Sequence, residues 1–158
     1  MKKFALLLLA TLFATTVFAQ EWSVGGRLGS GLQAVGQYHF NDKNYLEGRF
    51  GASWLGVISA DFTMLYNWKV KTMDWTDKGT WFFDSGVALN IGGVPYYAYL
   101  AVGGMFRLGY TFESKPVSLS FDYTPLLGVG CIYDRDLFGI IPRLAGIGNF
   151  GITCTYNF

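Results

Sequence analysis

Apolar and polar residues alternate one by one through most of this chain, and this period of two constrains the fold more than any other feature. Successive side chains of a β-strand point to opposite faces, so the alternation predicts strands with one apolar and one polar face. In residues 149–158, every even position is apolar or aromatic and every odd position is Asn, Gly or Thr. We expect eight such strands, within residues 22–29, 37–40, 46–54, 61–70, 80–92, 97–112, 117–127 and 149–158.

Charged residues support this assignment of faces, because every charge inside the expected strands falls on the polar face. Two strands test this independently, since Glu47 and Arg49 agree in phase, as do Asp61 and Lys69. A charged side chain on a lipid-facing surface costs about 2–4 kcal/mol for Arg or Lys at mid-bilayer. The charged residues inside the strands are Arg27, Glu47, Arg49, Asp61, Lys69, Asp84, Arg107 and Asp122.

The first residues have the three parts of a secretory signal peptide. Lys2 and Lys3 are followed by an apolar run over residues 4–13 and by small residues ending at Ala19. That run is shorter than the roughly 20 apolar residues of a spanning helix. We therefore expect residues 1–19 to be removed on export, leaving residues 20–158 as a single domain.

The other end carries an aromatic pair, Tyr156 and Phe158, two residues apart. This pair is typical of the last strand of outer-membrane barrels and predicts recognition by the barrel assembly machinery. Other aromatic residues fall near the ends of the expected strands, as interfacial girdles require. One girdle would hold Trp22, Phe40, Trp68, Trp81, Phe112, Tyr156 and Phe158, and the other Trp54, Tyr96 and Tyr97.

Together these features predict an all-β fold, an eight-stranded antiparallel up-and-down transmembrane β-barrel preceded by a cleaved signal peptide. Most connections are expected to be short. Residues 129–145 are expected to form the one substantial outer loop, and residues 71–79 a long inner turn. Cys131 and Cys154 would lie on the order of 30 Å apart at about 3.3 Å per residue, too far for a disulfide.

Several short motifs recur along the expected strands and their ends. They are Gly36–Phe40, Asn44–Gly51, Asn67–Lys69, Met73–Trp75, Trp81–Asp84 and Tyr110–Phe112. These motifs resemble those of small eight-stranded outer-membrane barrels, with the architecture of the OmpA transmembrane domain and OmpX. The chain is similar, more narrowly, to short uncharacterised barrels of Bacteroidota-type Gram-negative bacteria. The resemblance implies a fold and a location in the cell outer membrane, and it implies no activity.

An eight-stranded barrel has an interior just wide enough to be filled by side chains, so its inward charges must pair. We expect a lumen polar network made of Arg27, His39, Glu47, Arg49, Asp61, Lys69, Asp84, Arg107 and Asp122. His39 is the only histidine, so a site with several histidines is impossible. We expect no catalytic residue, no cofactor and no metal. A calcium site at Asp134–Asp136 is a weaker alternative to a solvated loop.

These arguments predict a monomeric structural or envelope-stabilising protein that is not an enzyme. Its partners would be outer-membrane lipid, lipopolysaccharide and, during insertion, the barrel assembly machinery, with no nucleic acid. Three alternatives stay open: a surface protein that binds a ligand or host factor through residues 129–145, a narrow passive pore, and a soluble periplasmic barrel with its polar face outside. The assigned faces predict that Ile152→Arg blocks membrane assembly, whereas Thr153→Arg is tolerated better.

Overall fold

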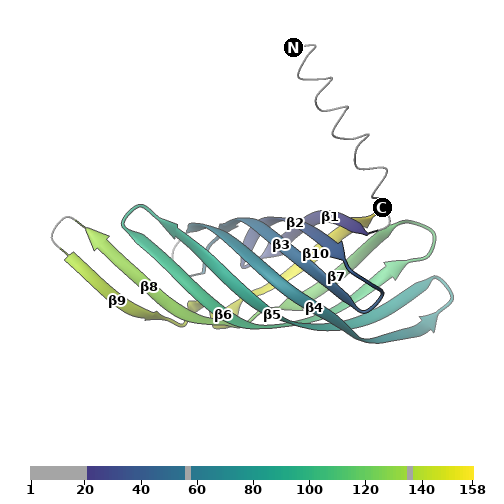
Figure 1. Cartoon of the computed structure of the whole chain (residues 1–158). Coiled ribbons are helices and arrows are strands. Elements are labelled where there is room, and N and C mark those ends of the chain that lie inside the picture. The colour runs from purple at the N-terminus through teal and green to yellow at the C-terminus, as the bar shows by residue number, and fades with distance from the viewer. Residues whose placement is uncertain (1–20, 56–57, 135–136) are drawn as a thin grey trace, which may run out of the picture.

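Ten β-strands and one short 3-10 helix make up the computed structural model of the chain, which describes residues 21–55, 58–134 and 137–158 (Figure 1). The strands are β1 (Trp22–Gly29), β2 (Gly31–His39), β3 (Asn44–Ser53), β4 (Ser59–Thr76), β5 (Gly79–Val94), β6 (Tyr97–Phe112), β7 (Val117–Tyr123), β8 (Leu126–Asp134), β9 (Leu137–Arg143) and β10 (Phe150–Asn157). The helix η1 (Ala145–Gly148) lies between the last two. The signal-peptide prediction concerns residues outside this description.

Eight of the strands close into an antiparallel barrel. This confirms the predicted all-β class and the predicted eight-stranded antiparallel barrel. The ring runs β1, β2, β3, β4, β5, β6, β7 and β10, and β10 pairs again with β1. One strand ladder followed around the ring leaves β6 at Ala101 and returns to it at Thr111, a stagger of ten residues (111 minus 101). Such a stagger accompanies strands tilted by about 35–45° and an interior filled by side chains.

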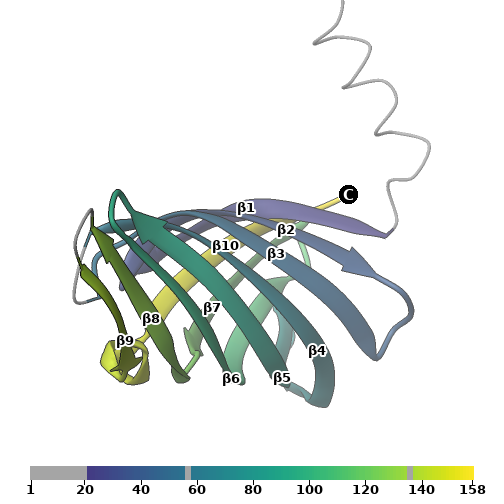
Figure 2. The ribbon, with the colours of Figure 1, turned by 60° about the vertical axis from the view of Figure 1, so that its left-hand side comes forward.

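The seventh predicted strand is divided at residues 124–125. β7 pairs with β10 and with residues 106–111 of β6, whereas β8 pairs with residues 97–103 of β6. Pro125 lies at the break, and it has no N–H to donate to a neighbouring strand. Beyond this point the chain no longer pairs with β10. β8 pairs with β6 and turns back as β9, and β8 and β9 form a hairpin that extends past the ring (Figures 1 and 2).

Two predicted connections are therefore wrong. Most of residues 129–145 belong to the β8–β9 hairpin, with η1 beginning at its end. The expected inner turn at 71–79 is mainly strand, because β4 continues to Thr76 and β5 begins at Gly79. Alternation becomes irregular there, with register shifts between Lys69 and Lys71 and between Met73 and Thr76, which hid the strand from the sequence pattern.

The two ends of the barrel are built differently. We call the end with the start of β1, the end of β10 and the turns at 40–43, 77–78 and 113–116 the terminal rim. The opposite end, with the turns at 30 and 95–96 and the β8–β9 hairpin, is the hairpin rim. Its first and third connections are as short as predicted. The second spans residues 54–58, of which 56–57 lie outside the description.

Exposed apolar side chains cover the outer face of the ring. Phe50 is 65% exposed and Ile152 55% exposed, while Arg49 and Thr153, their chain neighbours, are each only 1% exposed. Polar residues therefore point inward, the reverse of a soluble barrel with a polar exterior. Aromatic contacts follow the terminal rim, including Trp22 with Tyr38, and Tyr110 with Phe112, at centroid distances of 5.0 Å.

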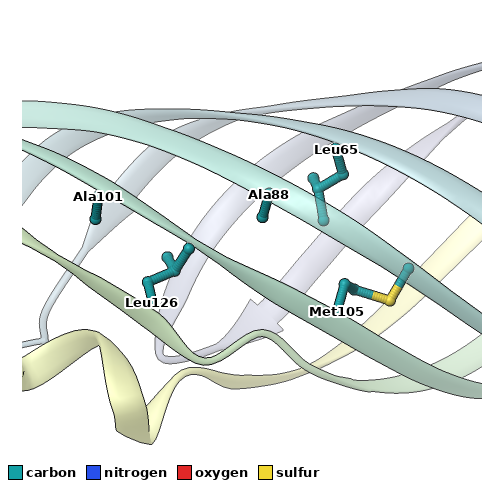
Figure 3. Packing of buried hydrophobic residues seen from close by; sticks show 5 residues of the cluster. All are labelled: Leu65, Ala88, Ala101, Met105 and Leu126. Carbon is teal, nitrogen blue, oxygen red and sulfur yellow. The ribbon is translucent and has the colours of Figure 1, made fainter.

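A small apolar cluster fills part of the interior toward the hairpin rim (Figure 3). Its members come from β4, β5, β6 and β8 and are Leu65, Ala88, Ala101, Met105 and Leu126. They occupy the inward phase of strands whose other inward positions are mostly polar. All five side chains are at most 6% exposed, so they pack the lumen rather than the outer wall.

Two further expectations can be compared with the structure. Cys131 and Cys154 are free, on β8 and β10, which confirms that they form no disulfide with each other. Tyr97, expected in an outer girdle, instead contacts inward-facing Tyr99 at a centroid distance of 5.9 Å. Among the described residues, no helix is long and apolar enough to cross a membrane.

Candidate functional site

Five of the nine predicted lumen residues form one chain of ion pairs across the barrel interior. Glu47 is the first acceptor: Arg107 binds it through two nitrogens, Nη1 to Oε2 at 2.7 Å and Nη2 to Oε1 at 2.8 Å. Arg49 Nε donates to the same carboxylate at 2.6 Å. Both Glu47 oxygens are thus held by guanidinium groups, and Gln37 adds a hydrogen bond at 2.6 Å.

Asp122 is the second acceptor. Arg49 Nη1 reaches Asp122 Oδ1 at 3.1 Å, so a single guanidinium bridges the two carboxylates. Arg27 binds Asp122 from the other side, with Nη2 to Oδ1 at 2.9 Å. The Thr153 hydroxyl donates to Oδ2 at 2.9 Å. The resulting order is Arg107, Glu47, Arg49, Asp122, Arg27, with charges alternating in sign.

This chain spans the full width of the barrel. Arg49 lies on β3 and Asp122 on β7, and these strands are four places apart in the ring in either direction. Each of the five side chains is at most 2% exposed. Charges buried to this degree are stable only when they are paired and hydrogen-bonded. The chain therefore closes the lumen at this level and fastens opposite walls to each other.

The other four predicted residues lie outside the ion-pair chain. Asp61 accepts from the neutral amides of Gln33 at 2.9 Å and Asn90 at 3.2 Å, toward the hairpin rim. Lys69 has the predicted phase, yet it is exposed at the terminal rim. His39 is half-buried, with Nε2 3.2 Å from Ser23 Oγ.

Asp84 is the fourth of these residues, and it joins the network through Tyr45, which the sequence analysis did not select. The Tyr45 hydroxyl donates to Asp84 Oδ2 at 2.7 Å and accepts from Arg107 Nη1 at 2.9 Å. Tyr45 is only 2% exposed. Tyr45 lies two residues before Glu47 and therefore has the inward phase of the same strand. That phase could have identified it as a lumen residue from the sequence.

Arg143 is a second residue whose role was missed. It lies on β9, in the region expected to be a loop, and it is 7% exposed. Its guanidinium carbon lies 3.6 Å from the centroid of the Tyr99 ring, a cation–π contact. Nη2 also donates to the Leu55 carbonyl at 3.2 Å. Arg143 thus ties the β8–β9 hairpin to β6 and to the connection between β3 and β4.

A cavity of about 600 Å³ lies inside the terminal rim. Asp84, Arg107 and Tyr45 line its inner part, and Lys69 and His39 are also among its lining residues. The ion-pair chain adjoins this cavity, because Arg107 belongs to both. The interior is therefore divided into a filled part and an open part.

Tyr156 and Phe158, the predicted assembly signal, lie at the terminal rim. Both are about half exposed, and their rings meet edge to face at a centroid distance of 5.1 Å. The Phe158 amide donates to the Trp22 carbonyl at 3.1 Å, which joins this end of the chain to β1. The pair is thus accessible on the outer surface next to the β1–β10 seam.

Among the described residues, no group of three or more His, Cys, Asp or Glu side chains could hold a metal ion. The alternative calcium site at Asp134–Asp136 includes residues outside the description. A comparison with known families, curated proteins and solved structures finds no match to this chain.

Proposed function

We propose that this chain is an exported, integral outer-membrane barrel with a structural, envelope-stabilising role, of the kind that the OmpA transmembrane domain and OmpX represent. The single observation that carries the proposal is the division of residue types between its two faces. Apolar side chains cover the outside, whereas Arg27, Glu47, Arg49, Arg107 and Asp122 are buried inside.

A bilayer accounts for this arrangement physically. Hydrocarbon offers no hydrogen bonds, so a spanning structure must satisfy its backbone groups internally, and a closed barrel does so. The outer face would contact lipid and lipopolysaccharide, and the aromatic side chains at the terminal rim would lie at the interface. Tyr156 and Phe158 would serve the barrel assembly machinery during insertion, and the barrel would act as a monomer.

The filled lumen favours a structural role over transport. The ion-pair chain crosses from β3 to β7 with side chains that are at most 2% exposed. A passive pore would need these groups to separate, which would leave buried charges unpaired. In planar bilayers we expect no single-channel conductance from the wild-type barrel. Steady conductance that increases when Arg107 or Asp122 is neutralised would support the pore instead.

Deletion of the gene tests the envelope role. We expect the deletion strain to become more sensitive to detergent and to large antibiotics that an intact outer membrane excludes. The wild-type chain and a variant lacking most of the β8–β9 hairpin should both restore resistance. Unchanged resistance in the deletion strain would contradict the envelope role, even where the protein is found in the outer membrane.

A second candidate function, surface binding through residues 129–145, is favoured by the free edge of β9. Within the described residues, β9 pairs only with β8. An unpaired edge strand can accept a further strand from a partner. Phe138 is 75% exposed and Ile140 64% exposed on the same hairpin. Ligand capture that is lost on deletion of residues 129–145, with the barrel intact, would establish this role.

A further inference from the structure

The cavity inside the terminal rim contains more negative than positive charge. Among the residues that line it, Glu21, Asp42 and Asp84 are acidic, and Lys69 and Arg107 are basic. Arg107 shares Glu47 with Arg49, so both Arg107 and Lys69 count as cations of the lining. Two positive charges thus lie against three carboxylates, and the remaining negative charge favours a cationic occupant.

Asp84 is the buried carboxylate of this set, at 2% exposed. Tyr45 binds its Oδ2, whereas its Oδ1 has no hydrogen-bond partner among the described residues. No arginine or lysine of the described chain forms a salt bridge with it either. A buried carboxylate with one unpartnered oxygen is costly, and a donor that carries positive charge would reduce this cost.

The cavity has the size and lining of a site for a small molecule. Its volume of about 600 Å³ lies within the range of roughly 300–1,000 Å³ that is typical of ligand sites. Tyr45, Phe82 and Phe40 add aromatic surface to the lining. Aromatic faces attract organic cations, whereas a hydrated inorganic ion gains less from them. The described residues also contain no cluster suited to a metal ion.

We propose that this cavity binds a small organic cation, an alkyl amine or diamine, with Asp84 as the principal anionic residue. Lys69 faces Asp84 in the β4–β5 ladder and acts as an internal competitor. The site belongs to the closed barrel itself and goes beyond the envelope role. It depends neither on the hairpin nor on the location of the barrel in a cell.

Calorimetric titration of the folded chain in detergent micelles tests this proposal. The probe is diaminobutane, and butanediol is a neutral molecule of matched length. At constant ionic strength we expect saturable binding of the diamine and none of the diol. Asp84→Asn should weaken binding by about tenfold, which corresponds to about 1.4 kcal/mol. This variant keeps an acceptor for the Tyr45 hydroxyl.

Two further variants make the test specific. Asp61→Asn removes a buried carboxylate that does not line the cavity, so it should leave the affinity unchanged. Lys69→Gln removes the exposed competitor and should strengthen binding, and it remains informative if Asp84→Asn fails to fold. Absence of saturable diamine binding, equal binding of the diol, or equal affinity in Asp84→Asn would each overturn the proposal.

Discussion

The two ends of the lumen use the same barrel wall in opposite ways. Toward the hairpin rim the interior is filled by the apolar cluster around Leu65 and Met105, and Arg143 ties the hairpin to β6 and to the connection between β3 and β4. Toward the terminal rim the interior opens into a cavity lined by Asp84 and Lys69. The ion-pair chain lies between them. This single layer of ion pairs fastens opposite walls to each other. The passage through the barrel can therefore stay blocked while one end of the lumen contains a cavity.

The largest expected effect comes from breaking the layer between the two ends. Glu47→Gln would leave Arg49 and Arg107 without their shared carboxylate in a buried site. Removal of one partner of a buried ion pair typically costs about 3–5 kcal/mol. Urea unfolding of the barrel in micelles, followed by gel mobility and near-ultraviolet circular dichroism, measures the loss. Asp61→Asn is the control, since the donors to Asp61 within the described residues are neutral amides, and its loss of stability should be clearly smaller.

A slightly smaller effect is expected on the outer wall. Ile152→Arg places a charge on the surface that we propose to face lipid, at a cost of about 2–4 kcal/mol, and should reduce assembly into membranes. Thr153 is an unsuitable inward control, because its hydroxyl binds Asp122 in the packed layer. Thr155 faces the cavity, where a longer side chain has room. Thr155→Arg should therefore assemble well, and equal assembly of both variants would contradict the assigned faces.

Substitution of two inward-facing glycines tests the difference between the filled and open parts of the lumen. A Cβ at Gly151 would lie 2.5 Å from Arg27 Cζ, which Asp122 holds in place. A Cβ at Gly109 would clash with Phe82 Cζ, yet Phe82 borders the cavity, which leaves space for its ring to shift. Overpacking costs about 1–3 kcal/mol, so Gly151→Ala should lose that much stability in urea unfolding. Gly109→Ala should lose less, and the reverse order would mean that the cavity wall is rigid.

The smallest effect is expected at the hairpin rim. Arg143→Met removes the contact with Tyr99, and a cation–π contact is worth about 0.5–2 kcal/mol. The hairpin should then open more often, and limited proteolysis should cut it faster while the barrel keeps its gel mobility. An unchanged cleavage rate would show that strand pairing with β6 alone holds the hairpin.

Much of the fold could be predicted from the sequence, because a strand that separates two environments shows this in every second residue. Glu47 and Arg49 revealed the inward face of β3, and Ile152 revealed the outward face of β10. The break at Pro125 was hidden because alternation fails beside it. Leu126 faces inward and Leu127 outward, yet both are apolar, so the pattern gave no sign that the chain stops pairing with β10 there.

The contacts within the lumen were less predictable than the faces. Pairing of Arg49 with Asp122 depends on the stagger of the strands around the barrel, and residues 73 positions apart reveal no such register in the sequence. The phase of Lys69 predicted a place in the lumen network. Its position near a register shift at the terminal rim instead leaves it exposed. Alternation determines which face a residue is on, whereas stagger determines which residues meet.

The most direct test of the central claim is fractionation of cells that express the chain, followed by gel electrophoresis with and without boiling. We expect a band in the outer-membrane fraction that migrates differently before and after heating, as a closed barrel that resists detergent does. A band in the soluble periplasmic fraction with the same mobility in both samples would contradict it.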